Sequence, residues 1–63
     1  MNEEKLKRKA VEDLEEIRQS GEFNMFLERR AIMQHANRNN MFNLVSYVGN
    51  DRQKYMEVLK ELG

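Results

Sequence analysis

Apolar residues in the first third of the chain recur at the spacing of an α-helix. The intervals are four, four and three positions, which places on one helix face the residues Leu6, Ala10, Leu14 and Ile17. Asn2 precedes this pattern as a suitable N-cap, and Ser20-Gly21 follows it as a stop signal. The pattern therefore predicts a long amphipathic helix over about residues 2–19.

A second helix is predicted over residues 27–37, after a connector of residues 22–26 that is rich in large apolar side chains. Asn24 is the candidate N-cap of this helix. The inner face of the helix is expected to hold Leu27, Ala31, Ile32 and Ala36. A connector this apolar has to pack against another part of the chain, because exposed patches of this kind are uncommon.

A third, short helix is predicted over residues 41–48, with Asn40 as its N-cap. A strand over residues 44–48 is the alternative, because β-branched and aromatic residues cluster there, but the chain offers no second strand to pair with it. The last helix is predicted over residues 52–62, with Asp51 as its N-cap. Its inward side chains are expected to be Tyr55, Val58, Leu59 and Leu62.

These elements predict one all-α domain over residues 1–63, a compact bundle of three to four short helices with a long first helix. A chain of 63 residues buries only about 60% of the surface that its unfolded form exposes. There is no cysteine, so no disulfide adds stability, and oligomerisation is the remaining ordinary device. We therefore expect a homo-oligomer, most simply a twofold dimer, with a well-packed monomer as the alternative.

The composition limits the class of protein. Hydrophobic residues make up 40% of the chain and charged residues 35%, which is typical of a soluble globular protein. No apolar run is long enough to cross a membrane, and the charged residues 1–20 hold no secretory signal. The net charge is zero, but residues 23–50 carry three arginines against one glutamate, which makes the middle of the chain mildly basic.

The sequence predicts a protein that is not an enzyme and needs no cofactor or metal ion. The carboxylates expected on the solvent side of the first helix are Glu12, Asp13, Glu15 and Glu16. The single histidine, His35, is a candidate base beside Glu28, but a histidine at the edge of an apolar stripe is more often packed there. There is no cysteine nucleophile, no glycine-rich phosphate loop and no histidine cluster for a metal ion.

The remaining candidate function is binding, through an apolar patch beside a basic edge. The residues expected to form this patch are Phe23, Met25, Phe26, Arg29, Arg30, Met33 and Arg38. Segments 27–37 and 41–48 also allow a helix-turn-helix whose arginines contact DNA, although a net charge of zero gives little counterion-release driving force. A small nucleotide held by these arginines, with Phe26 or Tyr47 stacked on its base, is a further alternative.

One part of the chain resembles a known family. The stretch Ile17-Arg18-Gln19-Ser20-Gly21-Glu22-Phe23-Asn24-Met25-Phe26 is similar to the opening signature of short uncharacterised proteins from phages and prophages of Gram-positive bacteria, which carry a domain-of-unknown-function label. In that family a helix ends in I-R-x-S-G, and N-M-F and a second helix follow. The similarity extends over about residues 11–62 and includes Tyr55.

The resemblance implies a phage protein in the cytoplasm of a bacterial host, and it brings no catalytic residue to this chain. We therefore expect a small non-catalytic binding protein whose partner is a bacterial host protein. Inhibition of a host defence protein is the most concrete form of this hypothesis. A small DNA-binding regulator that uses helix 27–37, or a structural accessory of a phage assembly, is the alternative.

Overall fold

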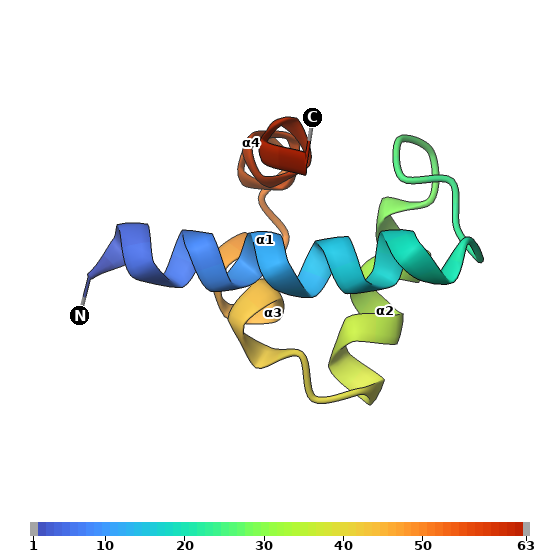
Figure 1. Cartoon of the computed structure of the whole chain (residues 1–63), viewed down its shortest axis with the longest axis horizontal. Helices are drawn as coiled ribbons and strands as arrows, with labels where there is room; N and C mark the ends of the chain where they lie inside the picture. Colours follow the sequence, from blue (N-terminus) through green and yellow to red (C-terminus); the bar gives the residue numbers. More distant parts are fainter. Residues whose placement is uncertain (1, 63) are drawn as a thin grey trace.

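The computed structural model describes residues 2–62, and within this range the chain forms four α-helices and no strand. The helices are α1 (Glu3–Ser20), α2 (Arg29–Arg38), α3 (Phe42–Val48) and α4 (Arg52–Leu62). Figure 1 shows α1 running along the length of the molecule, with the three shorter helices placed around it. The predicted all-α class is confirmed, and the strand alternative for residues 44–48 is wrong.

Both ends of α1 are closed as the sequence predicts. The Oδ1 atom of Asn2 accepts a hydrogen bond of 2.9 Å from the backbone N–H of Glu4. At the other end Gly21 has a left-handed conformation with φ 71°, and its N–H donates to the carbonyl of Arg18. The predicted inner face is confirmed by its buried or half-buried residues Leu6, Ala10, Leu14 and Ile17.

Helix α2 begins at Arg29 rather than at Leu27. The Oδ1 atom of Asn24 accepts hydrogen bonds of 3.0 Å from the N–H groups of Phe26 and Leu27, so Asn24 caps an isolated turn and not the helix. Glu28 precedes the first helical residue without a side-chain cap. Because Leu27 lies outside the helix, its predicted place on the inner face is wrong, and its side chain is 83% exposed.

The N-terminus of α3 is capped from another helix. The predicted cap, Asn40, takes a left-handed conformation with φ 60°, and α3 begins after Met41 without a cap from its own segment. Instead the Oδ2 atom of Asp13 in α1 accepts a hydrogen bond of 3.2 Å from the N–H of Leu44. Two predictions are therefore wrong: Asn40 does not cap α3, and Asp13 is half-buried against α3 instead of facing solvent.

The turn between α3 and α4 explains why glycine is needed at one position. Gly49, with φ 54° and ψ −123°, occupies the first central position of a type II′ turn. A hydrogen bond of 2.9 Å from the N–H of Asp51 to the carbonyl of Val48 closes this turn. The Asp51 carboxylate then accepts hydrogen bonds from the N–H groups of Gln53 and Lys54, which confirms the predicted cap of α4.

All four helices contribute to one hydrophobic core. Its buried residues are Ala10, Leu14, Ile17, Ile32, Ala36, Leu44, Tyr47, Val48, Tyr55, Val58 and Leu59. Leu62 and the connector residues Phe23 and Met25 are packed partly against it. The large apolar side chains that remain exposed are Phe26, Leu27, Phe42 and Met56. The connector is therefore buried only in part.

The cross-helix cap leads to a prediction about stability. Asp13→Ala removes the acceptor that α1 supplies to α3, and we expect the free energy of unfolding to fall by about 1 kcal/mol, the usual cost of a lost N-cap. Urea unfolding followed by circular dichroism measures the change. Glu12→Ala removes a neighbouring exposed carboxylate and should change stability by less than about 0.5 kcal/mol. Equal effects of the two substitutions would contradict the role of Asp13.

Candidate functional site

Two contacts hold the connector between α1 and α2 in place. They determine which of its side chains face outward. The Tyr55 hydroxyl of α4 donates a hydrogen bond of 2.5 Å to the carbonyl oxygen of Met25. The ring of Phe23 lies edge-on to His35 of α2, with 5.3 Å between the ring centroids. Phe23 and Met25 therefore pack toward the core, and the residues that follow them face outward.

Phe26 and Leu27 form an exposed apolar ridge at the end of the connector. Their side chains are 73% and 83% exposed. Beside the ridge lies a shallow depression of about 410 Å³ that is also lined by Arg29 and Arg30 of α2 and by Arg52 of α4. We call these five residues the connector surface. It combines adjacent apolar side chains with three guanidinium groups from two helices.

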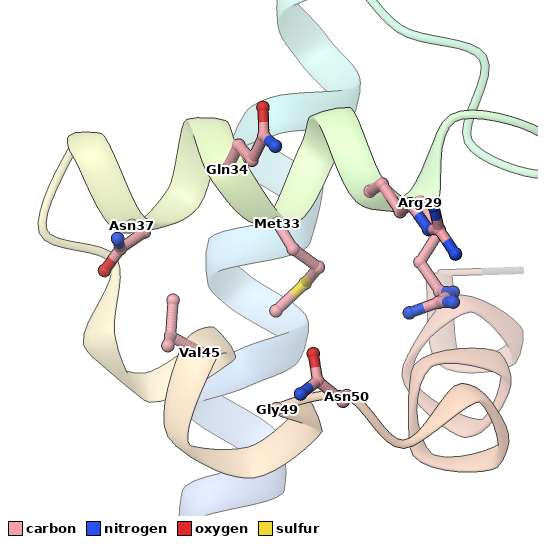
Figure 2. Close-up of a pocket in the computed structure, with 8 residues that line it drawn as sticks. Arg29, Met33, Gln34, Asn37, Val45, Gly49 and Asn50 are labelled. Atoms are coloured by element: carbon pink, nitrogen blue, oxygen red, sulfur yellow. The ribbon is translucent and has the colours of Figure 1, made fainter.

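A larger groove lies between α2 and α3 and begins at two of the same arginines. Its volume of about 720 Å³ is within the range of small-molecule sites. We call it the α2–α3 groove, and its lining residues are Arg29, Arg30, Met33, Gln34, Asn37, Val45, Gly49 and Asn50. In Figure 2 Arg29 lies at one end and Asn37 at the other, with Met33 between them, whereas the amide of Gln34 points away from α3.

The positive charge of these two features is not neutralised within the described part of the chain. Between residues 2 and 62 the ion pairs are Lys7–Glu57, Glu15–Arg18 and Glu3–Lys54. The acidic residue that lines the depression is Glu28, and its carboxylate already accepts a hydrogen bond of 2.7 Å from the N–H of Asn24. The groove lining contains no acidic residue. Both features are therefore suited to an anionic partner or ligand.

The structure brings some of the predicted binding residues together and separates another from them. Phe26, Arg29 and Arg30 lie on the connector surface. Met33 lines the α2–α3 groove beside the same two arginines. Arg38 is exposed at the other end of α2 and lines neither feature.

The observed patch differs from the predicted one at four residues. Phe23 and Met25 were predicted to belong to it but are half-buried, whereas Leu27 and Arg52 were not predicted and lie on the connector surface. Phe23 and Met25 are half-buried against the core, so they support the connector more than they face a partner. Leu27 was assigned to the inner face of a helix that begins after it. Arg52 is far from the connector in sequence, and no local pattern in the sequence indicates that the fold places it there.

Among the described residues that line the two features, Glu28 is the one carboxylate and there is no histidine. Residues 2–62 hold no group of three or more His, Asp or Glu side chains placed to bind a metal ion. The hydrogen bond from Arg18 lowers the pKa of Glu15, but this pair lies on α1 and lines neither feature. None of the helices in the described range has both the length and the apolar character that crossing a membrane requires.

Comparison with known proteins gives a family assignment. Residues 2–59 match a family described as a domain of unknown function, DUF5049. The chain belongs to this family. No curated protein and no solved structure matches it. The DUF5049 match covers α1, α2, α3 and most of α4, so the connector surface and the α2–α3 groove both lie within the family domain.

The contact between Tyr55 and Met25 predicts a dependence of stability on pH. Burial raises the pKa of the Tyr55 phenol above its ordinary value, and the positive charge of Arg29 opposes this in part. Because the folded state favours the neutral phenol, the resulting stabilisation is present below about pH 10 and is lost as the pH rises through the folded-state pKa. In Tyr55→Phe we expect a free energy of unfolding lower by about 1 kcal/mol at neutral pH and a shallower alkaline decline.

Urea unfolding at a series of pH values measures both effects. Tyr47→Phe is the matched control for the connector, because the Tyr47 hydroxyl donates its hydrogen bond of 3.5 Å to Glu57 instead. Burial raises the pKa of Tyr47 as well, so both substitutions should make the alkaline decline shallower, and the hydrogen bond to the connector is tested by exchange. Faster hydrogen exchange of the connector amides is expected in Tyr55→Phe and not in Tyr47→Phe. An alkaline decline of unchanged slope in Tyr55→Phe would contradict the role given to its phenol.

Proposed function

We propose that this DUF5049 protein is a small non-catalytic binding protein that contacts another protein through the connector surface. The observation that carries the proposal is the pair Phe26 and Leu27, whose adjacent large side chains are 73% and 83% exposed. Beside them lie three arginines that form no ion pair within residues 2–62. Contiguous apolar side chains at the surface mark interaction sites. Arginine and aromatic residues are also the types that dominate binding energy at interfaces.

The surface specifies the chemistry of its partner. Three guanidinium groups favour a partner with an acidic rim, and the ridge requires an apolar pocket at the centre of the contact. The cap from Asn24 and the hydrogen bond from Tyr55 hold the ridge in place before binding. A surface held in this way loses less conformational entropy when the complex forms.

The more specific form of the proposal concerns origin and target. The similarity of residues 17–26 to short phage and prophage proteins supports a phage-encoded protein that acts in the cytoplasm of a bacterial host. In this proposal the protein acts by occupying a surface of its target and not by catalysis. Inhibition of a host defence protein is the outcome that we propose for this binding.

The arrangement of the helices favours a protein partner over DNA. In a helix-turn-helix the second helix enters the major groove. Here α3 would take that place after α2, and its sequence FNLVSYV has no basic residue. The arginines of α2 remain available to phosphate, but the net charge of zero gives little long-range attraction to DNA.

The ridge provides a test of partner binding. The affinity-tagged chain is expressed in a Gram-positive host, and the protein that copurifies in equal amount is identified and its affinity measured. Phe26→Ser with Leu27→Ser should weaken binding about 30-fold or more, the effect of losing hot-spot residues. Phe42→Ser removes another exposed phenylalanine, 57% exposed on α3, and should leave the affinity unchanged. Capture of no host protein, or equal binding by all three chains, would contradict the proposal.

Self-association is the expectation that competes for the same ridge. A twofold dimer that buries Phe26 and Leu27 would hide the apolar part of the connector surface from another protein. Light scattering over a dilution series, with a thermal melt at each concentration, measures this self-association. A dimer whose melting temperature falls on dilution, because association then contributes to stability, would assign the ridge to self-association and contradict the partner contact proposed for it. A molecular mass equal to that of one chain at every concentration would exclude the dimer and leave the ridge available to the host partner.

A further inference from the structure

The α2–α3 groove differs in chemistry from one end to the other, whereas the connector surface does not. Arg29 and Asn37 are eight positions apart on α2, which separates them by about 12 Å along the helix axis. Figure 2 shows them at opposite ends of the groove, with the thioether of Met33 between them. The groove is therefore cationic at one end, apolar in its middle and supplied with an amide at the far end.

The opposite wall of the groove adds an apolar side chain toward the Asn37 end and an amide nearer the Arg29 end (Figure 2). Val45 of α3 adds a second apolar side chain, and Asn50 follows Gly49 at the type II′ turn. In Figure 2 the amide of Asn50 points across the groove toward α2. Gly49 adds no side chain to this wall, so the space beside Met33 remains open.

We propose that the α2–α3 groove binds a free nucleotide. Arg29 and Arg30 hold its phosphates, Met33 and Val45 contact the faces of its base and sugar, and Asn37 and Asn50 hydrogen-bond to its polar edges. Guanidinium groups match phosphate oxygens in charge and geometry, and side-chain amides can both donate to and accept from a base.

One observation favours a nucleotide over a smaller anion, and two more favour a ligand that carries phosphate. The volume of about 720 Å³ is far more than a phosphate ion fills and lies within the range of small-molecule sites. The two arginines make no ion pair within residues 2–62, so phosphate binding breaks no existing salt bridge. The lining contains no acidic residue that would repel phosphates.

This inference does not depend on the protein partner of the connector surface. The two features share Arg29 and Arg30, but Asn50 belongs to the groove alone, and Phe26 and Leu27 belong to the connector surface alone. Variants of the unshared residues therefore test the two proposals separately.

Isothermal titration calorimetry with ATP, GTP, CTP and UTP tests the inference directly. We expect one-to-one binding of at least one triphosphate, more than tenfold tighter than inorganic phosphate or the matching nucleoside. Arg29→Gln and Arg30→Gln should each weaken this binding about tenfold or more, because each removes charged hydrogen bonds to phosphate. Asn50→Asp places a negative charge in the groove at constant size and should weaken binding by a similar factor.

Arg38→Gln is the matched control, since it makes the same change of charge on α2 outside the groove. It should bind like the wild type, and so should Phe26→Ser with Leu27→Ser. Thermal melts confirm that each variant is folded before its titration is compared. Absence of binding by all four triphosphates, or equal binding by Asn50→Asp, would overturn the inference. Tighter and strongly salt-dependent binding of a single-stranded oligonucleotide would also overturn it, because the groove would then recognise nucleic acid.

Discussion

Burial against α1 supports α3 and α4 directly, and α2 packs mainly against α3. Helices α2, α3 and α4 have 10, 7 and 11 residues, and helices shorter than about 12–15 residues are marginal in water by themselves. The fully buried face of α1, with Leu14 and Ile17, supplies the apolar surface against which α3 and α4 pack. Asp13 on the same helix also satisfies a backbone donor of α3. Helix α1 thus provides an apolar surface for α3 and α4 and a polar cap for α3.

The surfaces available for recognition lie where this support ends. After Gly21 the connector leaves α1, and its residues Phe26 and Leu27 stay exposed. Arg29 and Arg30 stand between the exposed ridge and the α2–α3 groove and belong to both. A phosphate held by these arginines would remove positive charge from the surface offered to a protein. Occupation of the groove and contact at the ridge would therefore influence each other through shared charges, without any movement of the backbone.

A structural feature can be predicted from the sequence where the residues that determine it are close together in the chain. The spacing of Leu14 and Ile17 and the caps Asn2 and Asp51 each act within one or two turns of helix, and the structure bears them out. Nothing local, however, shows that Asn40 is not a cap. The acceptor used at α3 comes from a residue that is 31 positions away from the amide it serves, so it depends on how α1 and α3 pack.

The candidate site was less predictable for the same reason. The apolar connector and the arginines that follow it stand out in the sequence, but their exposure depends on tertiary contacts. Leu27 belongs to a helical pattern in sequence, and it faces outward because Asn24 closes a separate turn before α2 begins. Arg52 reaches the surface through the placement of α4. The hydrogen bond between Tyr55 and Met25 has a further consequence, because α4, which contributes Arg52 to the connector surface, also holds the connector in place. Opening of α4 would remove one of the two contacts that hold the connector, so the apparent affinity of the proposed partner for the ridge would fall with the fraction of molecules in which α4 is docked.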